Sequence, residues 1–389
     1  MAPSAFILLL VPVVLASLLA TTGNASFDLH GELNHPYAGR PISKYKMIRE
    51  AVRSSKARRA WNAARACRRG GGAISSPDVP VSSLGNSTYT ISISVGTPPQ
   101  RHTLLIDTGS DLVWIQCKTV GGAATATDPL YDPDKSSSFA TVPCDGKLCQ
   151  EGAFETRNCS NNRCLYTYAY GSGRTYGELA SETFTFGVHR KFPVPLDFGC
   201  GKFLSGDIFN ASGFLGLSPN TLSFVSQLKI PRIGSNFFYY LPLIGVSVGA
   251  KKLNVPATSF AETFIDSGYT TGALTAVARD ALKGALVDAL KLPQRNSSDP
   301  DYDFCFQLPH GVPMEAVRAP PLLYHFEGGA TMVLPRDSYL VEASPGEMCL
   351  LIGVDEQPVI GNYQQQNMHV LFDLQNQKFS FVPTQCDQI

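Results

Sequence analysis

Asp107-Thr108-Gly109-Ser110-Asp111 is the stretch of sequence that decides the fold. It stands between two apolar runs, 104–106 and 112–115, so it places a carboxylate at the end of a strand that enters a hydrophobic core. Burial of an ionised carboxylate is unfavourable unless hydrogen bonds or a shifted pKa compensate, and acids of that kind concentrate in active sites. On its own, Asp before Thr-Gly is also typical of an ordinary turn.

A second copy of the motif, Phe264-Ile265-Asp266-Ser267-Gly268, lies 159 positions further along the chain. Two apolar strands that each end in Asp, a small hydroxyl residue and Gly predict two similar lobes that bring Asp107 and Asp266 face to face. Glycine permits close backbone approach, and the Thr108 and Ser267 hydroxyls can hydrogen-bond across the junction.

The two motifs, with Trp114 after the first, resemble those of the pepsin-type aspartic proteases, and more narrowly the plant nepenthesin-like branch. The resemblance runs from about Tyr89 to Cys386 and implies an all-β dominated, bilobal fold with a few short helices. It implies an endopeptidase without metal or cofactor, in which Asp107 and Asp266 share one proton and activate a water at acid pH. Supporting positions in the two motifs follow from the same resemblance: Thr108, Gly109, Ser110, Ser267 and Gly268.

The segment from Tyr166 to Gly187 alternates aromatic and Thr residues and is interrupted by Tyr170-Gly171-Ser172-Gly173, which predicts a hairpin. By resemblance this hairpin is the flap that closes over substrate. The resemblance places Tyr170 at the flap tyrosine position and makes Trp114 able to hydrogen-bond its hydroxyl. Without the resemblance, a tyrosine in a strand is more often a packing residue.

Other segments predict the scaffold around the motifs. Residues 89–100 alternate as a half-buried strand does and stop at Pro98-Pro99. The elements 213–218 and 359–362 close the catalytic loops of the two lobes by resemblance. Apolar residues recur with helical spacing over 274–292, which predicts a core-facing helix that Thr275 could cap.

The N-terminal segment predicts entry into the secretory pathway. An uncharged apolar run, 6–20, is followed by Gly23-Asn24-Ala25, so we expect a signal peptide over residues 1–25, with an uncleaved anchor as the alternative. A basic prosegment is expected over 26–80, an N-terminal lobe with a Cys-rich insertion and the flap over 81–235, and a C-terminal lobe over 236–389. The mature chain is expected to be a monomer without a stable membrane anchor, in the apoplast or the vacuole.

The formal net charge of zero hides an asymmetry. Residues 26–80 carry 11 Lys and Arg against 4 Asp and Glu, whereas residues 81–389 carry 21 against 28. The basic run 53–69 would suit a solvated helix or a nucleic-acid patch, but a signal peptide makes nucleic acid an unsuitable partner. We expect the prosegment to cap the acidic cleft at neutral pH and to leave it as carboxylates gain protons.

Ten cysteines in a chain of the secretory pathway predict disulfides. The spacing suggests the pairs Cys144/Cys149, Cys159/Cys164 and Cys305/Cys349, whereas a zinc site is poorly matched by these spacings. The segment Cys117 to Cys164 is expected to be loop-rich rather than part of a sheet, and nine cysteines after Cys67 leave one over. Four sequons predict a glycoprotein, at Asn86, Asn158, Asn210 and Asn296.

Two departures from the family pattern support a second hypothesis. Tyr269 occupies the position where the family has a small Ser or Thr whose hydroxyl bonds the second catalytic acid, unless Thr270 substitutes. The connection between Leu228 and Phe237 is also shorter than in the family, which is expected to strand Cys200 without a partner. The alternative to an active protease is therefore a weakened or inactive paralogue that acts as a binding or inhibitor protein; a glycosidase fits the mirrored Asp-x-Gly context poorly.

Overall fold

The computed structural model describes residues 89–118, 130–170, 173–186, 191–205, 211–228, 238–297, 299–373 and 378–384, together with nine residues between 43 and 58. The predicted signal peptide, the bond cleaved on maturation and the short connection 229–237 lie outside the described residues. Within the described ranges, no helix combines the length and the apolar character needed to cross a bilayer.

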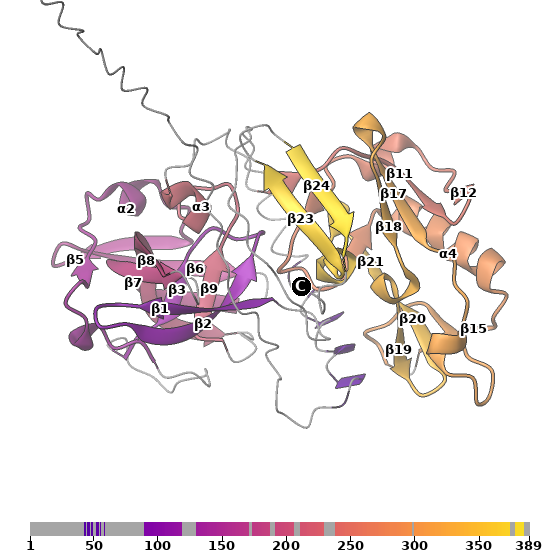
Figure 1. Cartoon of the computed structure of the whole chain (residues 1–389), viewed down its shortest axis with the longest axis horizontal. Helices are drawn as coiled ribbons and strands as arrows, with labels where there is room; N and C mark the ends of the chain where they lie inside the picture. The colour runs from indigo at the N-terminus through magenta and orange to yellow at the C-terminus, as the bar shows by residue number, and fades with distance from the viewer. Residues whose placement is uncertain are drawn as a thin grey trace, which may run out of the picture.

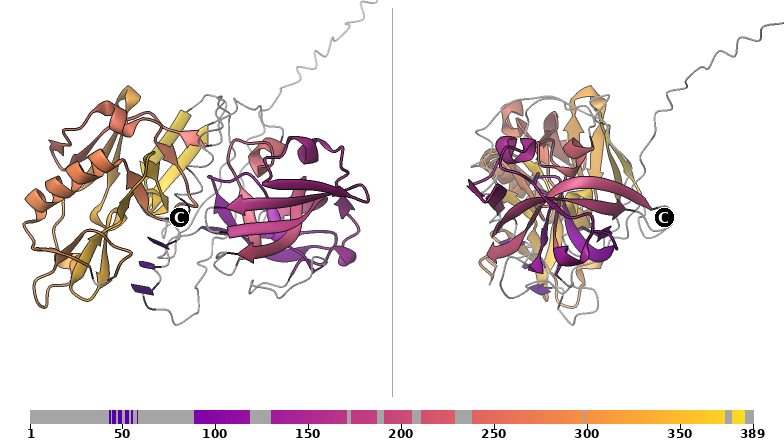
Figure 2. Two further views of the ribbon diagram at one scale, coloured as in Figure 1. Left: turned by 180° about the vertical axis from the view of Figure 1, so that it is seen from behind. Right: turned by 90° about the vertical axis from the view of Figure 1, so that its left-hand side faces the viewer.

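Two lobes built mainly of strands lie side by side (Figure 1; Figure 2). The N-terminal lobe holds one twisted sheet with the order β1-β2-β9-β3-β8-β7-β6-β5; β4 pairs with β7, and β1 also pairs with β7. Its elements are β1 (Thr90–Val95), β2 (Gln100–Asp107), β3 (Trp114–Gln116), β4 (Ala140–Thr141), β5 (Thr156–Ser160), β6 (Arg163–Tyr170), β7 (Gly173–Phe186), β8 (Phe192–Ser205) and β9 (Gly213–Gly216), with η2 (Pro133–Lys135), α2 (Lys147–Glu151) and α3 (Phe224–Gln227).

The C-terminal lobe divides its strands among smaller sheets, with the orders β10-β13-β22-β14-β21, β12-β11-β17-β18, β15-β16-β20-β19 and β23-β24. Its strands are β10 (Tyr239–Tyr240), β11 (Leu243–Val248), β12 (Lys251–Lys252), β13 (Phe264–Ile265), β14 (Gly272–Leu274), β15 (Gln294–Arg295), β16 (Cys305–Gln307), β17 (Leu322–Phe326), β18 (Thr331–Leu334), β19 (Leu340–Ser344), β20 (Glu347–Leu350), β21 (Ile352–Val354), β22 (Val359–Ile360), β23 (Met368–Asp373) and β24 (Lys378–Pro383). Its helices are α4 (Ala276–Leu290), α5 (Asn362–Gln365), η3 (Ala257–Phe260), η4 (Met314–Ala316), η5 (Glu327–Gly329) and η6 (Arg336–Ser338).

The same four-strand pattern surrounds each Asp-x-Gly motif. In the N-terminal lobe β2 runs parallel to β9, β9 antiparallel to β3, and β3 parallel to β8. In the C-terminal lobe β13, β22, β14 and β21 repeat these directions in the same order. A Cβ on Gly216 would overlap the carbonyl oxygen of Asp111, and a Cβ on Gly361 would overlap the carbonyl oxygen of Thr271. Glycine is therefore sterically required at both positions. The repeated motif therefore belongs to a repeated backbone.

The predicted strand and helix are confirmed with small changes. β1 alternates buried and half-buried residues as expected and ends at the turn that contains Pro98 and Pro99. Helix α4 begins after Thr275, but the Thr275 hydroxyl donates to the Ser259 carbonyl (3.0 Å) rather than capping the helix. α4 also buries Arg279, whose Nε donates to the Ile352 carbonyl (2.6 Å).

Two of the three suggested disulfide pairs are wrong. The described residues contain the bonds Cys117–Cys200, Cys144–Cys159, Cys149–Cys164 and Cys305–Cys349, of which only the last was suggested by the spacing. Cys159 and Cys164 are neighbours across the β5–β6 pair, yet Cys164 bonds to Cys149 on α2, and Cys159 bonds to Cys144, which precedes that helix. Cys200 is not stranded, because β3 and β8 run in parallel and bring it to Cys117. Cys67 and Cys386 lie outside the described residues.

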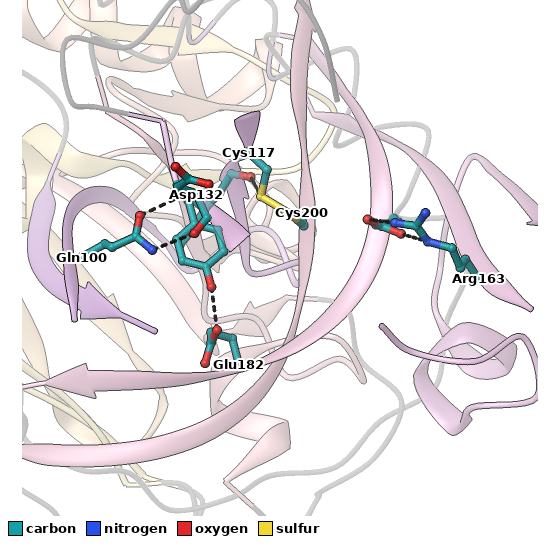
Figure 3. The surroundings of a disulfide bond; sticks show 9 residues. Gln100, Cys117, Asp132, Arg163, Glu182 and Cys200 are labelled. Atoms are coloured by element: carbon teal, nitrogen blue, oxygen red, sulfur yellow. Dashed lines mark hydrogen bonds and ion pairs between the residues drawn. A yellow bond between two sulfur atoms is a disulfide. The ribbon is translucent and has the colours of Figure 1, made fainter. Parts of the chain in front are cut away.

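The Cys-rich region is more regular than predicted. β4 and β5 both lie inside it and extend the sheet of the N-terminal lobe, so the expectation of loops alone is wrong. Figure 3 shows how its start is held: next to the Cys117–Cys200 bond, Gln100 exchanges hydrogen bonds with the Asp132 backbone (2.9 Å each). The buried Glu182 carboxylate accepts from the Tyr131 hydroxyl (2.5 Å), which ties this segment to β7.

Candidate active site

Asp107 is the last residue of β2, and its carboxylate is fully buried. The backbone turns immediately afterwards, because the Gly109 N–H donates to Asp107 Oδ1 (3.0 Å). The Ser110 hydroxyl donates to Asp107 Oδ2 (2.6 Å). This carboxylate therefore accepts two hydrogen bonds from donors within its own motif.

Asp266 follows β13 and is also fully buried. Its backbone N–H donates to the Ile360 carbonyl on β22 (3.1 Å), and the Gly268 N–H donates to Asp266 Oδ1 (2.8 Å). This arrangement mirrors that of Asp107 on β2 beside β9. The repeated strand pairing thus presents two carboxylates from the ends of equivalent strands.

Thr108 and Ser267 join the two lobes beneath these carboxylates. The Thr108 N–H donates to Ser267 Oγ (3.1 Å), and the Ser267 N–H donates to Thr108 Oγ1 (2.9 Å). The Ser267 hydroxyl donates in turn to the Ile106 carbonyl (3.2 Å). The predicted cross-junction contact of these two residues is present, and each hydroxyl accepts from a backbone N–H of the opposite lobe.

One guanidinium binds both carboxylates, which places Asp107 and Asp266 next to each other. Arg58 Nε donates to Asp266 Oδ2 (2.7 Å), and its Nη1 and Nη2 donate to Asp107 Oδ2 (3.0 Å) and Oδ1 (2.5 Å). Gly109 and Gly268 make this approach feasible: a Cβ on Gly109 would lie 2.5 Å from Asp266 Oδ2, and one on Gly268 would lie 2.5 Å from Asp107 Oδ1.

The electrostatics of the site follow from burial and from neighbouring charge. Burial raises the pKa of Asp266 to about 6; the nearby Arg58 cation opposes this rise, and the Asp107 charge adds to it. Burial alone would lower the pKa of the Arg58 guanidinium, but the charges of Asp107 and Asp266 raise it above its usual value. Arg58 therefore stays cationic while Asp266 titrates in mildly acidic solution.

The two carboxylates differ in their local donors because the second motif has Tyr269 where the first has Ser110. The Tyr269 ring is buried in an apolar cluster with Phe238, Phe264 and Val359. Among the described residues, the Asp266 carboxylate accepts hydrogen bonds from Gly268 and Arg58, and from neither Tyr269 nor Thr270. The suggested substitution by Thr270 is therefore absent, and among the described residues only Asp107 of the pair has a hydroxyl donor, Ser110.

The predicted hairpin is present as β6 and β7, with Tyr170 paired to Gly173. Residues 171 and 172, at its tip, lie outside the described residues. The Tyr170 ring is buried and stacks on Phe214 (centroids 4.7 Å apart), while Trp114 lies 6.1 Å away. The Tyr170 hydroxyl has no hydrogen-bond partner among the described residues, so the expected bond from Trp114 is wrong. The ring is held by apolar stacking instead.

Arg58 is the functional residue that the sequence did not single out. The basic run 53–69 indicated a cationic segment, yet no single arginine stood out within it. The sequence contains a weak indication of its position. Helical spacing relates Ile48, Val52 and Ser55 and predicts which face of a helix is buried, and Arg58 continues that face.

A possible metal cluster lies elsewhere and is already chemically satisfied. Cys305, Glu347 and Cys349 approach one another within the C-terminal lobe. Because Cys305 and Cys349 form a disulfide, they offer no thiolate to a metal.

Two lobes with equivalent strand pairing and a pair of adjacent buried aspartates define the class of pepsin-like proteins. Family profiles described as "Xylanase inhibitor N-terminal" and "Xylanase inhibitor C-terminal" match residues 89–250 and 238–383. Aspartic proteinase nepenthesin-1 of Nepenthes gracilis is 31% identical over 91% of this chain and 89% of its own length; nepenthesin-2 of the same species is 32% identical over 92% and 90%. The chain belongs to the nepenthesin-like aspartic protease family.

Solved structures agree on the fold at low sequence identity. Basic 7S globulin from soybean is 16% identical with a TM-score of 0.58, covering 81% of this chain and 96% of that one. The crystal structure of edgp is 15% identical with a TM-score of 0.60, covering 82% of this chain and 96% of that one.

We expect Thr108→Val to destabilise the protein by about 1 to 3 kcal/mol, because the isosteric side chain leaves the buried Ser267 N–H without its acceptor. Urea unfolding followed by tryptophan fluorescence measures this difference. Thr141→Val, on the exposed strand β4, is the matched control and should unfold like the parent. Equal midpoints for all three proteins would contradict the role of this junction.

Proposed function

We propose that this chain is a secreted aspartic endopeptidase, synthesised as a latent precursor, that hydrolyses peptide bonds at acid pH. The observation that carries the proposal is the convergence of Asp107 and Asp266 on one guanidinium. When two buried carboxylates lie next to each other without a cation, ionisation of both is energetically unfavourable. After Arg58 departs, the two acids therefore share one proton. A water between them is then placed for activation.

The unequal donors assign a role to each acid. Gly109 and Ser110 stabilise the ionised form of Asp107, which suits it as the general base that takes a proton from the attacking water. Asp266 has fewer donors and a raised pKa, so it carries the shared proton and donates a hydrogen bond to the scissile carbonyl. The roles reverse as the amine leaves: the acid that gained the proton delivers it to nitrogen.

Latency follows from the position of Arg58. Its guanidinium occupies the space between the carboxylates where water and the scissile bond would lie. As the pH falls through about 6, Asp266 gains a proton and its ion pair with Arg58 is lost. The basic segment that contains Arg58 is therefore proposed to be a prosegment that holds the site closed at neutral pH.

Other features support passage through the secretory pathway. Four disulfides among the described residues suit an oxidising compartment. The sequon residues Asn158 and Asn296 are exposed, as glycosylation requires. The expected signal peptide at residues 1–25 fits the same route to the apoplast or the vacuole, where the chain would act as a monomer.

A second candidate function is a binding or inhibitor protein on the same fold. Tyr269 favours it, because no described residue gives Asp266 a hydroxyl donor like the one that Ser110 gives to Asp107. The descriptions of the matching family profiles name xylanase inhibitors. Both acids and both glycines nevertheless retain a geometry in which a water can be activated, so hydrolysis is the function we favour.

The proposed function is tested by cleavage of a denatured protein substrate at acid pH and by its inhibition with pepstatin. Asp107→Asn should lower kcat/KM by about a hundredfold to ten-thousandfold, because one partner of the acid–base pair is lost. Asp145→Asn, in an exposed turn, is the control and should leave activity unchanged. A folded parent protein that cleaves nothing between pH 2 and pH 7 would support the binding protein instead.

Arg58→Gln should release the proposed latency at higher pH. The variant loses charge-assisted bonds to both carboxylates, so conversion of the precursor at pH 6.5 should be about tenfold faster or more. Conversion is measured by the change in mass on gels over time. Arg295→Gln, an exposed arginine of the C-terminal lobe, should convert at the parent rate. Identical rates for Arg58→Gln and the parent would remove Arg58 from the latency mechanism.

Tyr269→Thr should supply the missing hydroxyl to Asp266 and lower its pKa. A hydrogen bond to a charged group contributes about 1.5 to 3 kcal/mol, which corresponds to roughly one to two pH units. The basic limb of the kcat/KM profile of the activated enzyme should move to lower pH by this amount. A basic limb that Tyr269→Thr leaves in place would contradict the assigned asymmetry.

A further inference from the structure

The segment that delivers Arg58 also docks on the C-terminal lobe at a place outside the dyad. The described residues between 45 and 58 are helical, and in Figure 1 and Figure 2 these indigo pieces lie beside the C-terminal lobe, facing the N-terminal lobe. Ser55 Oγ accepts a hydrogen bond from the Thr271 N–H (2.9 Å). Ile48 lies ten residues before Arg58, which is about 15 Å along a helix axis.

Two ion pairs anchor this helix to a single loop. Arg49 pairs through Nε with Asp299, and Arg53 Nε lies 2.5 Å from Asp301 Oδ2. The two carboxylates are largely buried, with 13% and 12% of each side chain exposed, whereas the arginines are 42% and 59% exposed. Arginines four positions apart on one helix thus match carboxylates two positions apart on the loop.

Apolar contacts lie next to these ion pairs. Ile48 and Val52 are buried against a cluster of the C-terminal lobe, formed by Tyr302, Cys305, Val341, Ala343, Cys349, Leu351 and Tyr363. The cluster rests on β16, β19 and β20, and the Cys305–Cys349 bond makes it rigid. Departure of the helix would expose this surface, and an exposed apolar patch with a charged rim is typical of a protein interaction site.

We propose that the face formed by Asp299, Asp301 and this apolar cluster is a docking site for cationic amphipathic helices of polypeptide substrates. Before maturation, Ile48, Arg49, Val52 and Arg53 of this chain occupy the face. After maturation, a substrate helix takes their place, with two arginines four positions apart beside Ile or Val on one side of the helix. The proposal rests on the proposed protease function. It adds substrate selection by a surface that lies outside the dyad.

The test uses two fusion substrates that share one short fluorogenic cleavage sequence and a flexible linker. One carries residues 43–55 of this chain, which omit Arg58, and the other carries the same residues with Arg49→Gln and Arg53→Gln. For the acid-activated enzyme, the first fusion should have a KM about threefold to tenfold lower, with kcat unchanged, because two partly exposed ion pairs are gained. The enzyme variant Asp299→Asn/Asp301→Asn should remove the difference.

The unfused short peptide keeps the two proposals apart. The double variant should cleave it like the parent, and so should Asp288→Asn, which removes an exposed carboxylate paired with Lys251 elsewhere on the same lobe. If the parent enzyme does not cleave this peptide, the proposed protease function is wrong. Normal cleavage of it with equal KM for both fusions, or a difference that persists in the double variant, would overturn the docking site.

Direct binding provides a readout that needs no turnover. A chain with an inserted site for an unrelated protease within Ile74–Leu84 is cut and freed of its prosegment by gel filtration at acid pH. Labelled peptide 43–55 should bind it by fluorescence anisotropy even with pepstatin bound at the dyad, and about threefold to tenfold more weakly in Asp299→Asn/Asp301→Asn. Competition by pepstatin, or unchanged binding by the double variant, would also refute a separate docking site.

Discussion

The structure depends on holding two carboxylates side by side in a place that water hardly reaches. Asp107 and Asp266 are both fully buried, and each sits at the end of a strand that its partner strand fixes in register. Hydrogen bonds between the lobes keep the two carboxylates in this position. Thr108 and Ser267 form them, because the backbone N–H of each residue donates to the side-chain hydroxyl of the other. The glycines then let each acid approach the backbone of the other lobe.

The near-symmetry of the backbone makes the asymmetry of the side chains informative. Equivalent strands and turns would give the two acids equal surroundings, but Ser110 and Tyr269 occupy equivalent positions with opposite character. One lobe donates a hydroxyl to its carboxylate, whereas the other directs an aromatic ring into an apolar cluster. The two carboxylates therefore differ in their hydrogen-bond donors although the backbones around them are equivalent.

The features that the sequence predicted well are those encoded locally. The two Asp-x-Gly motifs, β1 with its turn, and helix α4 each follow from residues within about fifteen positions of one another. The disulfide partners could not be obtained this way, because Cys117 and Cys200 meet only through the parallel pairing of β3 with β8. Arg58 was missed for a related reason. A run of like charges does not indicate which arginine reaches the distant pair of carboxylates, since that depends on where the segment docks.

Arg58 takes one carboxylate from each lobe, and this has a mechanical consequence. The guanidinium links the two lobes through ion pairs with Asp107 and Asp266. Arg49 and Arg53, on the same segment, form ion pairs with the C-terminal lobe. While Arg58 is bound, movement of one lobe relative to the other would break charge-assisted hydrogen bonds. Without Arg58, the hydrogen bonds between Thr108 and Ser267 still connect the two lobes. If the segment that carries Arg58 is removed, as proposed, the site is uncovered and the two lobes also become free to move relative to each other around a bound substrate.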